Sequence, residues 1–146
     1  MRRDLKNNIG INVLLEAQDL AHTDTKSLIL DTAQFPGVAV AVAIGELTGV
    51  NASNYLTPVF QEADTIADAD FTDVGSGDLE GAFTVVDATT KDSTIQNVGY
   101  KGGKRYIRVS LDYTGTAITA GIVGVYGILG RAKEAPVVAP AAITAT

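Results

Sequence analysis

The sequence predicts an all-β protein: an antiparallel β-sandwich or jelly-roll-like barrel with extended N- and C-terminal arms. Valine and isoleucine, which favour strands, are among the dominant residues, and 15 glycines supply turns. Short apolar segments recur with turn signals about every 8–12 residues, and no long stretch carries a helical repeat bounded by capping residues. A chain of 146 residues is long enough to form one domain with a substantial core.

The first strand is expected over residues 9–17, where the larger apolar side chains fall at every second position: Ile9, Ile11, Val13 and Leu15. A helix over residues 4–16 is the alternative. A second, short strand is expected over 27–32. The segment GVAVAVAIGEL, residues 37–47, alternates β-branched side chains with alanine methyl groups, so neither of its faces is polar. We therefore expect this strand to be covered on both sides, by the core and by a further layer.

The remaining strands follow from the same kind of pattern. A strand over residues 54–64 contains Pro58, which cannot donate to a β-ladder, so we place this residue at an edge or a bulge. A short strand near 71–74 and a GSGD turn precede a longer strand over 82–88. The last three strands are predicted over residues 93–100, 104–113 and 117–132.

The two ends of the chain are expected to be extended arms around one domain. The predicted boundaries are an N-terminal arm at 1–8, a β-sandwich domain at 9–133 and a C-terminal tail at 134–146. Neither arm can bury enough apolar surface by itself to offset the roughly 1–2 kcal/mol per residue that backbone ordering costs. We therefore expect at least one arm to lie on a neighbouring chain.

Composition excludes several classes of function. The absence of cysteine excludes disulfides, thiolate metal sites and cysteine nucleophiles, and a single histidine, His22, argues against a histidine-based metal site or catalytic dyad. Serine and threonine residues have no base beside them, so we expect neither enzymatic activity nor a cofactor. The net charge of −6 argues against nucleic acid as a partner. No segment reaches the roughly 18 apolar residues of a membrane span, and polar residues interrupt the N-terminal apolar stretch as they do not in a signal peptide.

The stretch YKGGKRYIRVSLDYTG concentrates positive charge on an acidic protein. Its cations are Lys101, Lys104, Arg105 and Arg108. Gly102–Gly103 suits a hairpin turn, and the alternation that follows places Arg108 on the wet face of a strand. The stretch is either a solvated strand edge or a surface that docks on an acidic protein. A phosphate-binding loop is disfavoured because the glycine turn leads into a strand and not into a helix.

The middle of the chain is strongly acidic. Between residues 46 and 92 there are ten carboxylates against one cation, Lys91. The cluster Asp68, Asp70 and Asp73 lacks the glycine and the glutamate that a calcium loop places at its sixth and twelfth positions, and the absence of tryptophan argues against a glycosidase cleft. The acidic and basic stretches can instead pair between identical copies or with a larger lattice.

Three stretches resemble a family of small proteins from tailed bacteriophages and prophages, whose genes tend to lie beside the major capsid protein gene. They are MRRDLKNNIGINVLL at the start, LTPVFQEADTIADADFTDVGSGDLEGAF in the middle, and VGYKGGKRYIRVSLDYTGT near the end. The family motif Y-G-KRY-RV is matched by Tyr100, Gly102, Lys104, Arg105, Tyr106, Arg108 and Val109, whereas Ala63–Asp64 replaces the usual Ser–Asp.

The resemblance implies a virion structural protein, a capsid decoration (cement) protein on the outer face of the phage head, assembled in the host cytoplasm. Its implied partners are the major capsid protein and further copies of itself, a trimer being favoured. A head–tail joining or tail-tube component, which would form a six-membered ring, is one alternative. A glycan- or host-surface-binding module is another, and it predicts exposed aromatic clusters that five tyrosines and four phenylalanines spread over the chain do not supply. The expected capsid or subunit interface comprises Arg2, Arg3, Lys6, Val38, Ala41, Lys101, Lys104, Arg105, Arg108, Val137 and Val138.

Overall fold

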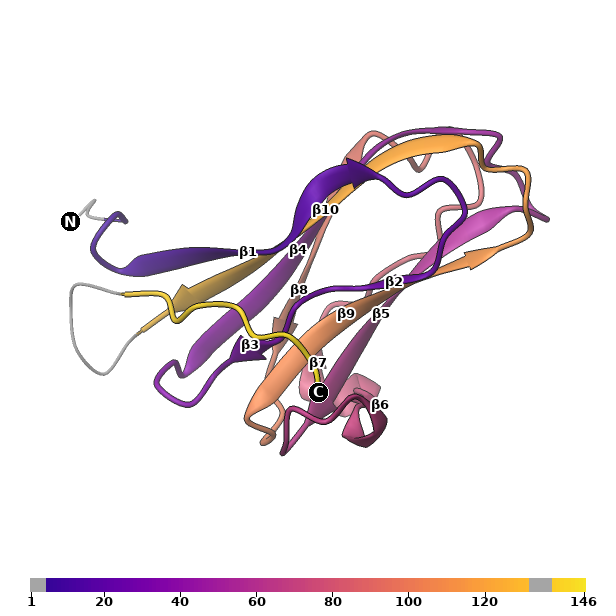
Figure 1. The fold of residues 1–146 in the computed structure, drawn as a ribbon. Helices are drawn as coiled ribbons and strands as arrows, with labels where there is room; N and C mark the ends of the chain where they lie inside the picture. The colour runs from indigo at the N-terminus through magenta and orange to yellow at the C-terminus, as the bar shows by residue number, and fades with distance from the viewer. Residues whose placement is uncertain (1–4, 132–137) are drawn as a thin grey trace.

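The computed structural model is an antiparallel β-sandwich, which confirms the predicted fold class (Figure 1). It describes residues 5–131 and 138–146. The first sheet has the strand order β1-β10-β4-β8-β7, and the second has the order β2-β9-β5-β6 with β3 also paired to β9. All pairings between these strands are antiparallel.

Each sheet has long central strands and short flanking ones. The first sheet comprises β1 (Ile9–Asp19), β10 (Ala120–Gly130), β4 (Gly37–Thr48), β8 (Thr94–Tyr100) and β7 (Leu79–Glu80). The second comprises β2 (Thr25–Lys26), β9 (Tyr106–Thr114), β5 (Tyr55–Ala63), β6 (Thr72–Asp73) and β3 (Leu30–Asp31). Two 3₁₀ turns, η1 (Asp68–Asp70) and η2 (Ser76–Asp78), lie in the acidic middle of the chain.

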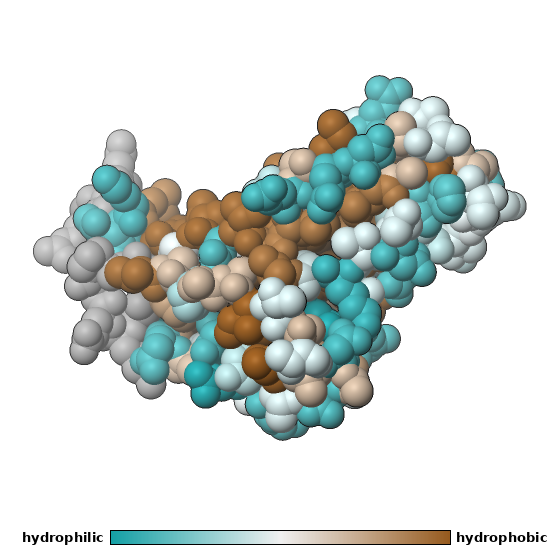
Figure 2. Space-filling view, viewed as in Figure 1, coloured by the Kyte–Doolittle hydropathy of each residue, from teal (hydrophilic) through white to brown (hydrophobic). Residues whose placement is uncertain are grey.

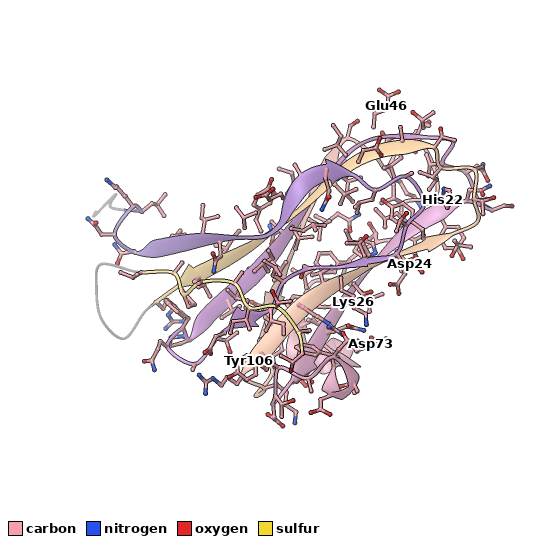
Figure 3. All side chains as sticks on the ribbon, viewed as in Figure 1. His22, Asp24, Lys26, Glu46, Asp73 and Tyr106 are labelled. Atoms are coloured by element: carbon pink, nitrogen blue, oxygen red, sulfur yellow. The ribbon has the colours of Figure 1, made fainter. Side chains whose placement is uncertain are left out.

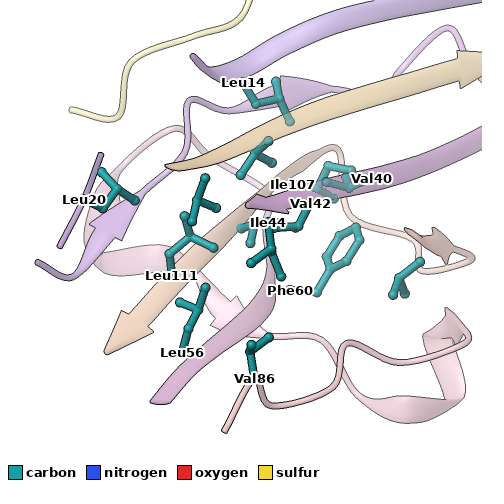
Figure 4. Packing of buried hydrophobic residues seen from close by; sticks show 14 of the residues in the cluster. Leu14, Leu20, Val40, Val42, Ile44, Leu56, Phe60, Val86, Ile107 and Leu111 are labelled. Atoms are coloured by element: carbon teal, nitrogen blue, oxygen red, sulfur yellow. The ribbon is translucent and has the colours of Figure 1, made fainter. Parts of the chain in front are cut away.

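The core lies between the two sheets (Figure 4). The first sheet contributes the β-branched face of β4, with Val40 and Val42 fully buried. The second sheet faces it with Ile107 and Leu111 of β9. Phe60 of β5 extends the core with two stacked rings, its centroid lying 6.0 Å from that of Phe83 and 5.7 Å from that of Tyr100. The alternation seen in residues 38–44 therefore corresponds to a true inner face.

The N-terminal segment is a strand, as predicted, and the helix alternative is wrong. Its exposed side chains are nevertheless apolar: Ile11 is 68% exposed and Val13 47%, whereas Leu14 is fully buried. The register between β1 and β10 shifts between Val13 and Leu15, so Leu15 also packs against the core. The alternating residues before this bulge lie on the outer side of the first sheet.

Pro58 lies at an edge, as predicted. β5 pairs with β9 along its length, but on its other side it pairs with β6 only through Gln61 and Glu62. Leu56 and Phe60 direct backbone hydrogen bonds to that open side, to Val86 and Val74 respectively. Because backbone groups alternate in direction along a strand, the Pro58 nitrogen points to the open side, where a missing N–H is tolerated.

The predicted strand over residues 82–88 is wrong. Within this range only Val86 forms a bridge, with Leu56. The Gln96 side chain takes the place of a ladder neighbour, because its amide oxygen accepts from the Thr84 N–H (2.8 Å) and its amide nitrogen donates to the Thr84 carbonyl (3.0 Å). The segment predicted over 27–32 forms only short pieces, with β3 pairing to β9 and Ile29 to the C-terminal segment.

The C-terminal segment, residues 138–146, lies on its own chain (yellow in Figure 1). Ile143 exchanges two backbone hydrogen bonds with Ile29, of 2.7 and 2.9 Å, and the Thr146 N–H donates to the Ile66 carbonyl. Ile143 and Ala145 pack on a second small cluster formed by Ile29, Ala63 and Phe71. The described part of this arm is therefore held by contacts within its own chain, and the expectation that at least one arm lies on a neighbouring chain stays a prediction.

Candidate interaction surface

The outer side of the first sheet carries rows of apolar side chains, two of which run across four strands and one across three. The strand register gives the rows Ile11–Ile128–Ala39–Gly99, Val13–Tyr126–Ala41–Asn97 and Gly124–Ala43–Ile95. We call the side chains of these rows, together with Ile122, the apolar face. Its only amide is that of Asn97, and it contains no charged residue. The face is therefore a continuous uncharged surface.

The apolar face is exposed to solvent in the part of the chain that the structure describes. Ile95 is 73% exposed, Ile11 68% and Ile122 57%. Figure 2, in which β1 lies toward the viewer, shows brown hydrophobic residues along this edge of the sandwich, between teal hydrophilic areas. Isolated exposed apolar residues are ordinary, but contiguous patches of this kind mark interaction sites in soluble proteins.

Shallow hollows lie at the two ends of the apolar face. One, of about 540 Å³, is lined by Gly37, Gly99 and Gly130 with Ala39 and Ile128, and the polar side chains of Asn8, Glu80, Asn97 and Arg131 also border it. The other, of about 360 Å³, lies between Ile95 and Ile122 and is lined by two glycines, two alanines, Ile44, Ser93 and Thr94. Because glycine has no side chain, these positions leave depressions between the larger isoleucines.

Ala41 lies at the centre of the apolar face and not in the core. It is paired with Tyr126 on one side and Asn97 on the other, and it is only 8% exposed because its methyl group is short. Val38, by contrast, is half-buried and packs against the core. The expected further layer over the alanine side of β4 is not formed by any described residue, so this side remains available to a partner.

Three of the four cations of the basic stretch pair with carboxylates of the same chain. Lys104 Nζ donates to the Asp64 carboxylate. Arg105 Nη2 lies 2.8 Å from Asp31 Oδ2, and this hydrogen bond is the main reason why the pKa of Asp31 is lowered. Arg108 pairs with Asp68. The fourth cation, Lys101, has no ion-pair partner among the described residues. Three cations of the basic stretch are therefore neutralised within one copy, two by Asp64 and Asp68 of the acidic stretch and one by Asp31 outside it.

Arg108 is buried, so its predicted place on a wet strand face is wrong. Its side chain is 2% exposed, its Nη1 lies 2.5 Å from Asp68 Oδ1, and its Nε donates to Gln61 Oε1 at 3.0 Å. The guanidinium also lies over the Phe71 ring. Segment 64–73 thus covers the outer side of β9, and Arg108 is an internal anchor instead of an interface residue.

Lys26 extends this network to the surface. Its Nζ donates to both carboxylate oxygens of Asp68, at 2.9 and 3.1 Å, and these bonds together with Arg108 lower the pKa of Asp68. Figure 3 shows Lys26, Asp73 and Tyr106 around the same end of the second sheet, with His22 far from it. The His22 Nδ1 lies 3.2 Å from the Ile118 carbonyl oxygen, which ties a loop together.

Tyr100 contacts the other residues of the Y-G-KRY-RV motif that form the glycine hairpin, Gly102 and Lys104. The Tyr100 hydroxyl donates to Glu62 Oε2 at 2.5 Å and accepts from the Lys104 N–H at 2.9 Å. A Cβ on Gly102 would lie 2.5 Å from the Tyr100 ring, so only glycine fits there. Burial, reinforced by Glu62, raises the pKa of the Tyr100 hydroxyl. The hairpin is thus closed by internal bonds.

The acidic cluster is engaged in separate interactions. Asp70 accepts from the Thr65 hydroxyl at 2.5 Å, and Asp73 accepts from the Gln61 amide at 3.0 Å, while Asp68 binds the two cations above. Among the described residues no group of three or more acidic, histidine or cysteine side chains could hold a metal ion. No helix in the described part of the chain is long and apolar enough to cross a bilayer.

The structure places the predicted interface residues in different environments. Arg2, Arg3 and Val137 lie outside the described residues, Lys6 is exposed, and Val138 is 78% exposed. The isoleucines of the apolar face were missed. The available signal was that residues 121–129, like 38–44, are apolar on both sides, so two adjacent strands had no polar outer face. Comparison of the sequence with protein-family models and with curated proteins finds no match.

Proposed function

We propose that the protein is a virion structural protein, a capsid decoration (cement) protein that binds the outer face of a phage head and stabilises the shell. The observation that carries this proposal is the uncharged, exposed apolar face on one side of a rigid sandwich. Such a surface suits permanent association with another subunit of an assembly, as a structural protein requires, because obligate interfaces resemble a domain core cut in half. The resemblance of three stretches to small phage proteins is the reason why we propose a phage head as the assembly.

The polar groups of the chain support a structural role. The charged side chains of the basic stretch and of the acidic cluster are held mainly in ion pairs and hydrogen bonds that fix loops to strands, as in Lys104–Asp64 and Arg108–Asp68. Catalytic groups need a free face toward a substrate. Here the same groups fix loops to the strands, and the module that results suits a structural part of a shell.

The segment 81–93 favours decoration over a head–tail or tail-tube ring. A ring component needs a long loop that changes conformation on assembly, and this is the longest stretch between strands in the described chain. It is fixed at several points: Val86 bonds to Leu56 in both directions, Thr84 bonds to Gln96, and Asp92 accepts from the buried Leu47 N–H at 3.0 Å. A loop fixed in this way is poorly suited to switching.

The proposal is tested with phage heads assembled without this chain, from the major capsid protein whose gene the resemblance leads us to expect beside its own. Purified protein is added, the heads are sedimented, and bound protein is counted before electron-microscopy reconstruction. We expect saturable binding, density on the outer surface of the shell, and disruption of decorated heads at a higher temperature than bare heads. Absence of binding, or density confined to a sixfold ring at the neck, would contradict the proposal.

A further inference from the structure

We infer that the apolar face is the surface through which two copies of this chain pack sheet against sheet. The inference rests on the proposed function, because it names the partner that binds the apolar face on which that function is argued. It concerns contact between copies only and leaves the contact with the shell to other surfaces. The occupant follows from area, charge and shape.

The area of the face matches what a pair of copies requires. With strands ~4.8 Å apart and a rise of ~3.3 Å per residue, the outer side of β1, β4 and β10 over about nine residues and of β8 over about seven, the hollows included, presents ~540 Å². Two such faces in contact bury on the order of 1,100 Å², which clears the ~1,000 Å² expected of a biological interface. A face of this size is larger than most exposed patches on monomers and sufficient for a dimer.

Charge favours another copy as the occupant. Each chain carries a net charge of −6, so two copies repel each other over most of their surfaces. The apolar face contains no carboxylate, and it is therefore where two acidic copies can approach most closely. At its border, Glu80 and Arg131 line the same hollow, so the charge at that end of the rim is balanced within one copy.

The shape of the face is self-complementary about a two-fold axis that runs across the strands. Such an axis turns one copy end for end, and the exposed Ile95 and Ile122 of one copy then lie over the glycine-lined hollow at Gly37, Gly99 and Gly130 of the other. Residues of the central row lie near the axis and face their own counterparts. Packed sheets lie about 10 Å apart with interdigitated side chains, which this alternation of isoleucines and glycines permits.

The first experiment measures the mass of the purified full chain by light scattering and sedimentation equilibrium, with no capsid present. We expect twice the 15.2 kDa chain mass at micromolar concentration. The double variant Ile95→Asp/Ile122→Asp should weaken dimerisation by at least roughly 100-fold, because carboxylates are buried without partners. The matched control Thr114→Asp/Thr116→Asp adds the same charge at exposed positions at and just after the end of β9, in the second sheet. It should dimerise as the wild type does.

A second experiment reports on the geometry without altering the isoleucines. The chain has no cysteine, so a bifunctional maleimide with a short spacer joins only introduced thiols. Asn97→Cys, exposed and in the central row, should give a crosslinked dimer, whereas Thr114→Cys should not.

The outcomes separate this inference from the proposed function. A wild-type chain that is monomeric at about 100 μM, a trimer, or a dimer that the aspartates do not weaken overturns the pairing of apolar faces. A monomeric chain that decorates heads overturns the pairing and leaves the function standing. A dimer that meets both expectations but fails to bind heads supports the pairing and removes the capsid role.

Discussion

The guanidinium carbon of Arg108 lies 4.0 Å from the centre of the Phe71 ring, which places the most deeply buried charge of the described chain under the acidic segment. Asp68, from the same segment, completes the arrangement by accepting a hydrogen bond from Arg108 Nη1. A cation held by a ring face and a carboxylate fixes two elements that are far apart in sequence. The outer side of β9 is therefore a structural joint.

Replacing Arg108 with alanine should destabilise the protein by about 2–4 kcal/mol, since it removes a buried side chain and leaves a cavity under Phe71. The measurement is chemical denaturation followed by circular dichroism. The matched control is Arg105→Ala, whose side chain is 55% exposed and whose pair with Asp31 is screened by water, so we expect little change. Equal losses for the two variants would contradict an anchoring role for Arg108.

A chain that ends at Glu134 should be less stable than the full chain by about 2–4 kcal/mol, because the fully buried Ile29 loses its backbone partner and its apolar cover. From the sequence alone, an arm held by a neighbouring chain predicts that the truncated protein keeps the thermal midpoint of the full chain. The single substitution Ile143→Asp should reproduce most of the loss, whereas Thr144→Asp, at an exposed position, should not. Denaturation midpoints of the three variants decide between the two expectations.

Tyr113→Phe should stabilise the protein by about 1 kcal/mol at neutral pH. The Tyr113 hydroxyl is buried and has no hydrogen-bond partner among the described residues. Burying an unsatisfied hydroxyl costs desolvation free energy that a phenylalanine ring at the same place does not. Tyr55→Phe is the control for loss of a tyrosine hydroxyl. A Tyr113→Phe protein that is less stable than the wild type would show that this hydroxyl is satisfied.

The same tyrosine predicts a loss of stability at alkaline pH. Burial, together with Asp19 and Asp24, raises the pKa of Tyr113 from 10.0 to about 12 in the folded protein. The neutral phenol therefore contributes stability that is fully present below pH 10, the unfolded value, and is lost as the pH rises toward 12. Stability measured from pH 8 to pH 11 should fall less steeply in Tyr113→Phe than in the wild type, and parallel curves would exclude this contribution.

The two sides of β4 should respond differently to a charge. Ala41→Glu places a long side chain that can extend from the apolar face into solvent, so the variant should fold and lose self-association. Val42→Glu buries a carboxylate in the core and should give no soluble folded protein. Soluble yield and the cooperativity of thermal unfolding distinguish them, and an unfolded Ala41→Glu variant would place Ala41 in the core.

The basic stretch should not bind nucleic acid specifically. Lys104, Arg105 and Arg108 each pair with a carboxylate of the same chain, so few cations remain to replace counterions on DNA. In a fluorescence anisotropy titration with duplex DNA at physiological salt, we expect no affinity tighter than the non-specific range of about 10⁻⁴–10⁻⁶ M. Nanomolar binding would overturn this expectation.

The sequence by itself determined the fold class and most of the strands, because alternation is a local property of the backbone that does not depend on distant neighbours. Residues 37–47 and 104–113 are strands as predicted, and Pro58 lies on the open side of its strand. For residues 37–47 the sequence predicted a layer on both sides, and no described residue forms the outer one.

Only the tertiary structure decided what covers each strand. The alternation around Arg108 is the same whether its side faces water or protein, and it was segment 64–73, about 40 residues earlier in the chain, that buried it. The bulge in β1 likewise placed Ile11 and Val13 outside, and the Gln96 amide took the place of a strand partner for Thr84. Local patterns specify which side chains share a side of a strand, whereas burial depends on contacts between residues that are distant in sequence, which periodicity does not encode.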